Sequence, residues 1–302
     1  MKTLKVAWNN LYRHPLPDNH RFPMLKYELL PEQLLYEGTL AKENFFSPEP
    51  VSEELILKVH EKSYWNRLKS LELSKKEQRA TGFPHSNELI EREITIMGGT
   101  VKCAEFALKN GISMNIAGGT HHAFSTHGEG FCLLNDQALA SIWLLNAKKA
   151  SRILIVDLDV HQGNGTAEIF KNEPRVYTFS VHGAKNYPLK KEISDTDIGV
   201  PDGINDDEYL QIVDHNLREI CYKFKPDFVF YQCGVDILSS DKLGRLGVSL
   251  QGCKRRDELV FSKILDLDVP VVCSMGGGYS DDIKIIIEAH ANTFRLAQQM
   301  FF

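Results

Sequence analysis

The sequence predicts an α/β protein in which an open, mostly parallel sheet is sandwiched by helices in a single domain, residues 1–302. Short apolar runs typical of buried strands alternate with segments of helical periodicity. No long linker, repeat or low-complexity tract divides the chain. Unusual polar residues follow several of the apolar runs, where parallel sheets bind ligands. Together these observations favour one layered domain.

The first part of the chain predicts four elements, which are a strand over 4–8, a loop and short helix over 14–36, a long helix over 88–110 and a strand over 114–117. Prolines and aromatic residues in the 14–36 segment favour a loop that walls a pocket. Gly98 and Gly99 are expected to interrupt the long helix, and Gly111 to cap its end.

The rest of the chain pairs helices with strands, predicted as helix 136–147 and strand 152–156, helix 166–171 and strand 176–181, helix 206–224 and strand 228–232, and strand 271–274 and helix 280–298. This βαβα order predicts parallel strands with helices on both faces. The charge run 254–258 is expected on a solvent-exposed helix face.

Composition narrows the classes of function. A chain of 302 residues with 43% hydrophobic residues can fill a large core. A formal net charge of -5 offers no strong basic field, so direct nucleic-acid binding is not expected. The N-terminus lacks a signal-peptide core, and no stretch approaches the roughly 20 apolar residues of a membrane span. Six scattered cysteines without a CxxC pair favour a reducing, cytoplasmic setting.

Four predicted strands end in reactive or glycine-rich residues, namely segments 118–122, 157–161, 233–236 and 275–279. Since parallel strands place their carboxyl ends at one edge of a sheet, these segments are expected to converge on one site. The second of them follows the most apolar strand, 153–156, and holds two carboxylates and an imidazole. This convergence makes it the centre of the predicted site.

Side-chain alternation puts Asp157, Asp159 and His161 on one side of the extended chain. Burying such carboxylates without a partner costs several kcal/mol, so a metal ion or hydrogen-bonded partner is implied. Asp159, His161 and Asp236 are the predicted ligands, although Asp236 alone would be read as a turn or helix-cap residue. Zn²⁺ suits a site with open positions, and Fe²⁺ also fits these ligand types.

The number of metal ions follows from two further positions. A two-metal hydrolase of the arginase kind has a similar scaffold, but it needs aspartates two residues beyond His161 and two beyond Asp236. Gly163 and Leu238 occupy those positions here. One metal ion is therefore favoured over two.

Three other side chains suit acid, base or hydrogen-bonding roles. The tandem His121 and His122 follow a Gly-Gly turn, and imidazoles have a pKa near working pH, which favours proton transfer over a packed and an exposed histidine. Tyr279 follows three glycines and could donate a hydrogen bond to a developing oxyanion, or could simply be a surface aromatic residue.

The segments GGTHHAFSTHGEGFCLLND (118–136), DLDVHQGNGTAEIF (157–170), CGVDIL (233–238) and MGGGY (275–279) resemble the histone deacetylase family, especially its class IV-like branch and bacterial relatives. The resemblance implies Zn²⁺ on Asp159, His161 and Asp236, with metal-activated water attacking the acyl carbon of an amide. It also implies that Tyr279 holds the carbonyl oxygen, that His122 is the general base and acid nearest the leaving amine, and that His121 pairs with Asp157 and tunes the charge of the site. Which of the two histidines moves the proton in each step stays open.

Two further sites are implied by the same resemblance. Asn164 stands where class I enzymes carry an Asp oriented toward the second histidine, and the class IV-like branch shares this Asn. An amide can orient His122 by hydrogen bonding without stabilising its charge. An inner K⁺ site is implied at Asp157, Asp159, His161, Ser180 and Val181, although Ser180 is equally read as an ordinary strand hydroxyl.

For the substrate, the resemblance implies a narrow tunnel for the stem of an acylated lysine, lined by Gly130, Phe131, Tyr187, Leu243 and Gly277. Ordinary core packing is the alternative for these residues. Acetyl-lysine in proteins is the expected substrate, while longer acyl groups and small acylated amines such as acetylpolyamines stay open. A non-catalytic acyl-lysine binding module would keep the tunnel but lose a ligand, a histidine or Tyr279, and all of these are present.

Overall fold

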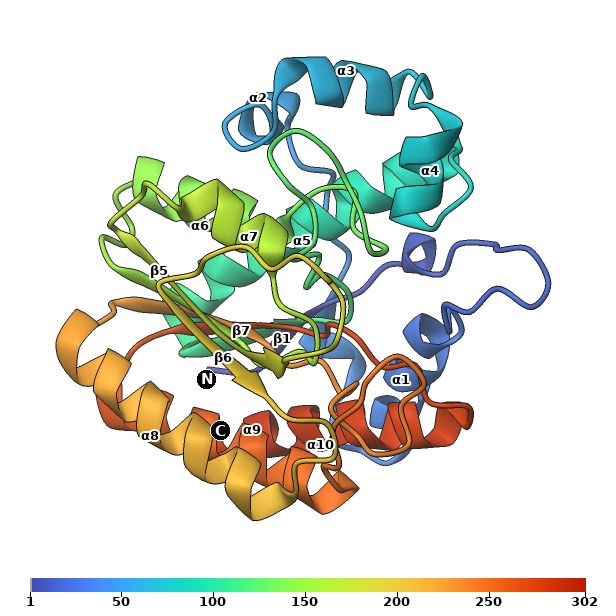
Figure 1. The fold of residues 1–302 in the computed structure, drawn as a ribbon. Coiled ribbons are helices and arrows are strands. Elements are labelled where there is room, and N and C mark those ends of the chain that lie inside the picture. The colour runs from blue at the N-terminus through green and yellow to red at the C-terminus, as the bar shows by residue number, and fades with distance from the viewer. Residues whose placement is uncertain (1) are drawn as a thin grey trace.

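The computed structural model describes residues 2–302 and contains one eight-stranded sheet in the order β2-β1-β3-β8-β7-β4-β5-β6 (Figure 1). The strands are β1 Lys5–Ala7, β2 Phe45–Phe46, β3 Ile112–Asn115, β4 Ile153–Asp157, β5 Val176–Gly183, β6 Thr196–Val200, β7 Phe228–Gln232 and β8 Val271–Ser274. Every pairing between named strands of residues 2–302 is parallel, which confirms the predicted fold class.

The helices are α1 Lys26–Tyr36, α2 Glu53–Ile56, α3 Lys62–Lys69, α4 Lys75–Thr81, α5 Asn87–Asn110, α6 Asp136–Asn146, α7 Asn164–Phe170, α8 Asp206–Phe224, α9 Leu250–Leu267 and α10 Ile283–Phe301, with short 3-10 helices at Asn10–Tyr12 and Lys42–Asn44. Figure 1 shows α5, α6 and α7 on one face of the sheet and α8, α9 and α10 on the other. Helices α2 to α4 lie beyond α5, away from the sheet.

The central strands are apolar because both of their faces are covered. All residues of β4, β7 and β8 are buried, as expected for a parallel sheet between two helical layers. In the register, Asp157 lies opposite Gln232 and Asn115 lies opposite Ser274, so these strands end at one level. The segments that follow β3, β4, β7 and β8 therefore meet at a single edge of the sheet.

Helix α5 corrects one prediction from the sequence. It runs without interruption through Gly98 and Gly99, so the expected break there was wrong. A Cβ at Gly98 would collide with the carbonyl oxygen of Glu49, which shows that this glycine allows another segment to approach the helix. Gly111 does end the helix with φ +94°, and its N–H donates to the Ala107 carbonyl, as predicted.

The charge run 254–258 on α9 corrects another prediction. Arg256 and Asp257 are fully buried and form an ion pair at 2.8 Å, so the run is not a wholly solvent-exposed face. Asp257 accepts hydrogen bonds from the Tyr231 and Thr293 hydroxyls, and Arg256 Nη1 donates to the Gly234 carbonyl at 2.6 Å. This satisfied network makes burial of the charges tolerable, and it anchors the loop that follows β7.

Smaller differences lie at the edges of the fold. Strand β3 begins two residues earlier than predicted, and the sequence analysis did not predict α2, α3, α4 or the edge strand β6. Helix α3 nevertheless buries Tyr64, Trp65 and Leu68 on one face. The burial of β6 alternates because its outer face is open to solvent. Within residues 2–302, the helices are too short or too polar to span a bilayer.

Candidate metal and catalytic site

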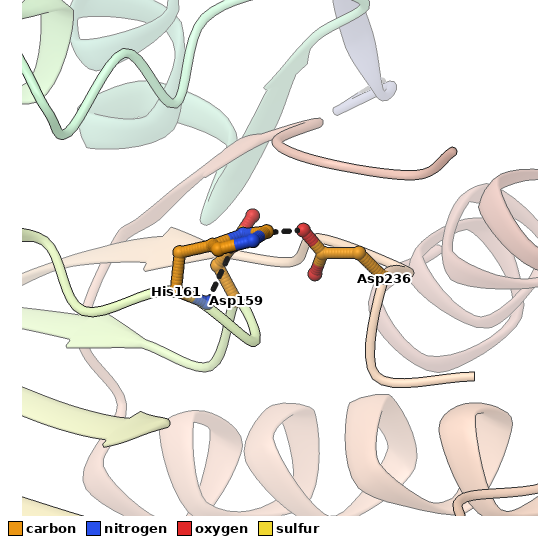
Figure 2. Close-up of side chains that lie close together, drawn as sticks. All are labelled: Asp159, His161 and Asp236. Atoms are coloured by element: carbon orange, nitrogen blue, oxygen red, sulfur yellow. Dashed lines mark hydrogen bonds and ion pairs between the residues drawn. The ribbon is translucent and has the colours of Figure 1, made fainter. Parts of the chain in front are cut away.

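Three buried side chains converge at the carboxyl edge of the sheet, as predicted from the strand ends. Asp159 and His161 follow β4, and Asp236 follows β7. One ligand atom from each residue lies within 4.8 Å of the others. His161 Nδ1 is 3.0 Å from Asp159 Oδ1 and 3.1 Å from Asp236 Oδ2, and Figure 2 shows the side chains pointing toward one another. The three side chains are close enough together to hold one metal ion.

Backbone groups hold the two carboxylates in place. The Gly277 N–H donates to Asp159 Oδ2 at 2.9 Å, and the Val160 N–H donates to Asp236 Oδ1 at 3.0 Å. A Cβ at Gly277 would overlap Asp236 Oδ2, so only glycine permits this approach. Gly277 was predicted to bind substrate. In the structure its N–H instead donates a hydrogen bond to Asp159, one of the three residues Asp159, His161 and Asp236 that are called the ligand cluster below.

The residues present fit a metal ion. Burial and the nearby charge of Asp159 raise the pKa of Asp236 to about 7, which shows how unfavourable two adjacent buried carboxylates are without a cation. Two carboxylates and an imidazole suit Zn²⁺, and three protein ligands leave a position open for other ligands. A divalent cation held by Asp159, His161 and Asp236 would balance this charge.

His121 and His122 lie beside this cluster with their ring centroids 4.1 Å apart. His121 Nδ1 is 2.7 Å from Asp157 Oδ2, and His122 Nδ1 is 2.7 Å from Asn164 Oδ1. Both pairings therefore have the geometry expected from the resemblance. Each pairing uses Nδ1, so the Nε2 atom of each ring is free of that bond.

The two imidazoles have opposite pKa shifts. Burial disfavours the charged form of His121, but the carboxylates of Asp157 and Asp159 outweigh burial and raise the pKa of His121 to about 9. Burial and the positive charges of His121 and His161 hold the pKa of His122 well below its usual value, because an Asn164 amide gives little compensation. These shifts favour the charged form of His121 and the neutral form of His122, and a neutral imidazole can accept a proton.

Tyr279 follows the glycine turn after β8 and its ring centroid is 6.4 Å from that of His161. Its backbone N–H donates to Asp241 Oδ2 at 2.6 Å, which fixes the turn. Burial, together with the charges of Asp159 and Asp236, raises the pKa of the Tyr279 phenol well above its usual value. The phenol is therefore a protonated hydrogen-bond donor facing the site.

A pocket of about 370 Å³ leads from the surface to His122, His161 and Tyr279. Its walls include four of the five predicted substrate residues, which are Gly130, Phe131, Tyr187 and Leu243. A further cavity of about 40 Å³ lies beside the ligand cluster. The geometry brings the predicted tunnel residues and the predicted reactive residues to one place.

Comparison with known proteins assigns the family. The histone deacetylase domain model matches residues 20–294. This chain belongs to the histone deacetylase family. An uncharacterised protein of Picosynechococcus sp. is 43% identical over 98% of this chain and 99% of its own length, and histone deacetylase 2 of Arabidopsis thaliana is 31% identical over 91% of this chain and 74% of its own length.

Solved structures support the same fold. A histone deacetylase homologue complexed with SAHA covers 98% of this chain with a TM-score of 0.81 and 25% identity, over 83% of its own chain. A homologue from Aquifex aeolicus covers 97% with a TM-score of 0.83 and 24% identity, also over 83% of its chain, and this second likeness bears on the fold alone. Membership of the class IV-like branch stays a prediction.

Several residues at the site of this histone deacetylase-family chain were not predicted from the sequence, namely Arg21, Lys26, Arg79 and Glu129. Lys26 is fully buried, and its ammonium group donates to the Gly276 carbonyl at 3.1 Å and lies over the Tyr279 ring. The expectation that the segment 14–36 walls a pocket identified the region of Arg21, without identifying the residue.

The implied K⁺ site stays a prediction. The register of β4 and β5 places Asp157 opposite Ser180, next to Val181. The Ser180 hydroxyl is hydrogen-bonded to His182 Nδ1 at 2.9 Å. Asp157 also bonds His121, so a cation there would contact the same carboxylate that orients this imidazole.

Proposed function

We propose that this chain is a metal-dependent amide hydrolase that removes acetyl or other acyl groups from lysine side chains of proteins. Asp159, His161 and Asp236 would hold one Zn²⁺, with Fe²⁺ as the alternative ion. The observation that carries the proposal is the buried cluster of Asp159, His161 and Asp236 at the foot of a pocket that His122 and Tyr279 also line. Family membership supports the same reaction class.

The bound metal would supply a Lewis acid that polarises the amide carbonyl and lowers the pKa of water. His122 Nε2 would take a proton from the attacking water and return it to the leaving amine, because its Nδ1 is turned to Asn164. The Tyr279 hydroxyl would donate a hydrogen bond to the carbonyl oxygen as negative charge develops there. His121, held by Asp157, would add a positive charge beside the site.

The pocket favours lysine in polypeptides over an acetylpolyamine. Phe131 and Tyr187 provide apolar walls for an aliphatic stem. Arg21 and Arg79 also line the pocket and are exposed, and no carboxylate of residues 2–302 is among its lining residues. The Glu129 carboxylate, near the Tyr187 phenol, is bonded to Asn164. Two guanidinium groups repel a polyamine, which carries further positive charges, and attract acidic residues next to an acyl-lysine.

The volume of the small inner cavity limits the length of the acyl group that the site can hold. About 40 Å³ is room for a short chain, and Phe22, Tyr27 and Ile96 stand along its boundary. A long fatty acyl chain would require these side chains to move, which costs free energy in a packed interior. The cavity therefore favours acetyl over octanoyl or myristoyl groups.

The test is deacylation by protein reconstituted with Zn²⁺ or, under anaerobic conditions, with Fe²⁺. Matched lysine peptides would carry acetyl, butyryl, octanoyl or myristoyl groups, with N-acetylputrescine alongside and a chelator control. We expect chelator-sensitive turnover that is fastest on the acetyl peptide and slowest on N-acetylputrescine. Preference for N-acetylputrescine would establish the polyamine alternative, and peptide binding without turnover at full metal loading would establish a non-catalytic acyl-lysine binding module.

A further inference from the structure

The loop between residues 128 and 132 carries a carboxylate that the proposed reaction does not use. Asn164 Oδ1 is 2.7 Å from His122 Nδ1, and Asn164 Nδ2 donates to Glu129 Oε1 at 2.6 Å. His122 and Asn164 are buried, while Glu129 is partly buried. A chain of two short hydrogen bonds thus leads from the imidazole to a carboxylate outside the ligand cluster.

The backbone holds this loop against the imidazole. The N–H groups of Gly130 and Phe131 donate to the carbonyls of Ala80 and Thr81 at the end of α4, at 3.0 and 2.9 Å. Gly130 has φ +54°, and a Cβ there would lie 2.5 Å from His122 Cδ2. Because the loop is bonded on one side and packed on the other, the Glu129 carboxylate has a defined position relative to His122.

The position of the Glu129 carboxylate helps to determine which end of the Asn164 amide, the oxygen or the NH₂ group, faces His122. An amide can be rotated to exchange its oxygen and its NH₂ group, and hydrogen-bond partners decide between the two orientations. Rotation here would place Oδ1 against the Glu129 carboxylate, two acceptors in contact. Two groups therefore fix the amide: the Glu129 carboxylate draws Nδ2 toward itself, and the Gly165 N–H donates to Oδ1 at 3.1 Å. Both direct Oδ1 toward His122, where an oxygen accepts only from a protonated Nδ1.

We propose that Glu129 is a positioning residue for deacylation, which orients the Asn164 amide and thereby holds His122 as the Nδ1–H tautomer. The neutral imidazole then presents the Nε2 lone pair to the site, as a general base requires. The inference rests on the proposed function for its effect on rate. The effect of Glu129 on the His122 tautomer does not depend on turnover and can be measured without a substrate.

Other groups also face His122. They are His121, His161, Asp159, Cys132 and Tyr187, with Tyr187 lying edge-on at 5.0 Å between ring centroids. Burial and the charge of Glu129 raise the pKa of the Tyr187 phenol, so the carboxylate acts on both rings. Of the side chains near His122, Glu129 is the one that bonds the Asn164 amide, while the Gly165 N–H bonds the same amide from the backbone.

A double-mutant cycle separates this role from a general loss of structure. Asn164→Asp would bring a second carboxylate into contact with Glu129, and like charges at this distance repel. Glu129→Gln added to Asn164→Asp replaces the clash with an amide that donates to the new carboxylate at position 164, which can still accept from His122. Charge and hydrogen bonds are then exchanged between the two positions with little change of shape.

We expect Glu129→Ala and Asn164→Asp each to lower kcat about tenfold with little change in KM, since neither side chain is proposed to touch substrate. Glu129→Gln alone should lose less, because it keeps an acceptor oxygen. The double variant should recover to within about threefold of the wild type. As a matched control, Glu168→Gln added to Asn164→Asp should not recover, because Glu168 bonds Ser125 on a neighbouring segment.

The tautomer is measured separately by ¹⁵N NMR of histidine-labelled protein, with and without Zn²⁺. We expect His122 to be the Nδ1–H tautomer in the wild type and a mixture in Glu129→Ala. A double variant no faster than Asn164→Asp, or a tautomer unchanged in Glu129→Ala, would overturn the proposal. If no substrate is turned over, the proposed function fails, and the NMR result still decides the role of Glu129 on His122.

Discussion

The side chains of His121 and His122 are adjacent in the chain, yet their surroundings drive their protonation in opposite directions. A carboxylate accepts from His121, whereas an amide accepts from His122. The difference of one charge between these partners is amplified by burial, where screening by water is weak. The protonation of the two imidazoles therefore depends on the residues behind the rings.

The sequence predicted site residues only where a local pattern, such as an apolar strand or a tandem pair of histidines, precedes or contains them. Asp159, His161 and Asp236 follow apolar strands and tandem histidines are conspicuous, so the cluster could be inferred from the sequence. Lys26 and Gly276 are 250 positions apart, and Glu129 and Asn164 are 35 apart. Such contacts depend on tertiary packing, which no local periodicity encodes.

His60 gives a prediction about pH and stability. Burial lowers the pKa of His60 to about 4, and the ring nitrogens are bonded to the Phe124 carbonyl and the Asn135 N–H. In the unfolded chain a histidine has a pKa of about 6.5, so the unfolded state binds more protons between pH 6.5 and 4. Stability is therefore lost as pH falls through this window.

From pH 7 to pH 5 this single group should remove about 2 kcal/mol of unfolding free energy. We expect urea titrations of metal-free protein to show that the wild type loses this much more than His60→Gln, which has no titrating group. An equal loss in both proteins would show that His60 is not held neutral in the fold.

At the scale of elements, apolar patterns predicted the central strands and the long helices because burial on both sides of a sheet requires them. They missed the short elements β6 and α2 to α4, although α3 buries Tyr64, Trp65 and Leu68 on one face. They also failed for Gly98 and for the Arg256 and Asp257 pair, where a neighbouring segment compensates a locally unfavourable residue. Local propensity is a weak guide at such contacts.

Gly98 in helix α5 tests whether contact with a neighbouring segment outweighs local helix propensity. Alanine is favoured over glycine in a helix by about 1 kcal/mol, so propensity alone predicts that Gly98→Ala is stabilising. The overlap with the Glu49 carbonyl predicts the opposite, a net loss of about 1–3 kcal/mol from overpacking. Denaturant unfolding measures the difference. Leu108→Ala, on the exposed side of the same helix, should change stability by no more than about 0.5 kcal/mol.

At the scale of the whole molecule, one sheet edge collects side chains from widely separated segments. Strands β3, β4, β7 and β8 end together, and each is followed by residues of the site. Arg256 of α9 donates to the carbonyls of Leu158 and Gly234, one residue before Asp159 and two residues before Asp236. The layered fold is thus also the support that holds the ligand cluster.

We propose that Asp159, His161 and Asp236 hold a metal ion that Tyr279 and the histidines use for amide hydrolysis. The most direct test of this proposal is metal content and acetyl-peptide turnover, measured together for wild type, Asp236→Ala and Tyr279→Phe, with circular dichroism to confirm folding. We predict one Zn²⁺ and turnover in the wild type, loss of both in Asp236→Ala, and retained Zn²⁺ with turnover about a hundredfold slower in Tyr279→Phe. A folded Asp236→Ala protein that keeps its metal and its activity would contradict the account.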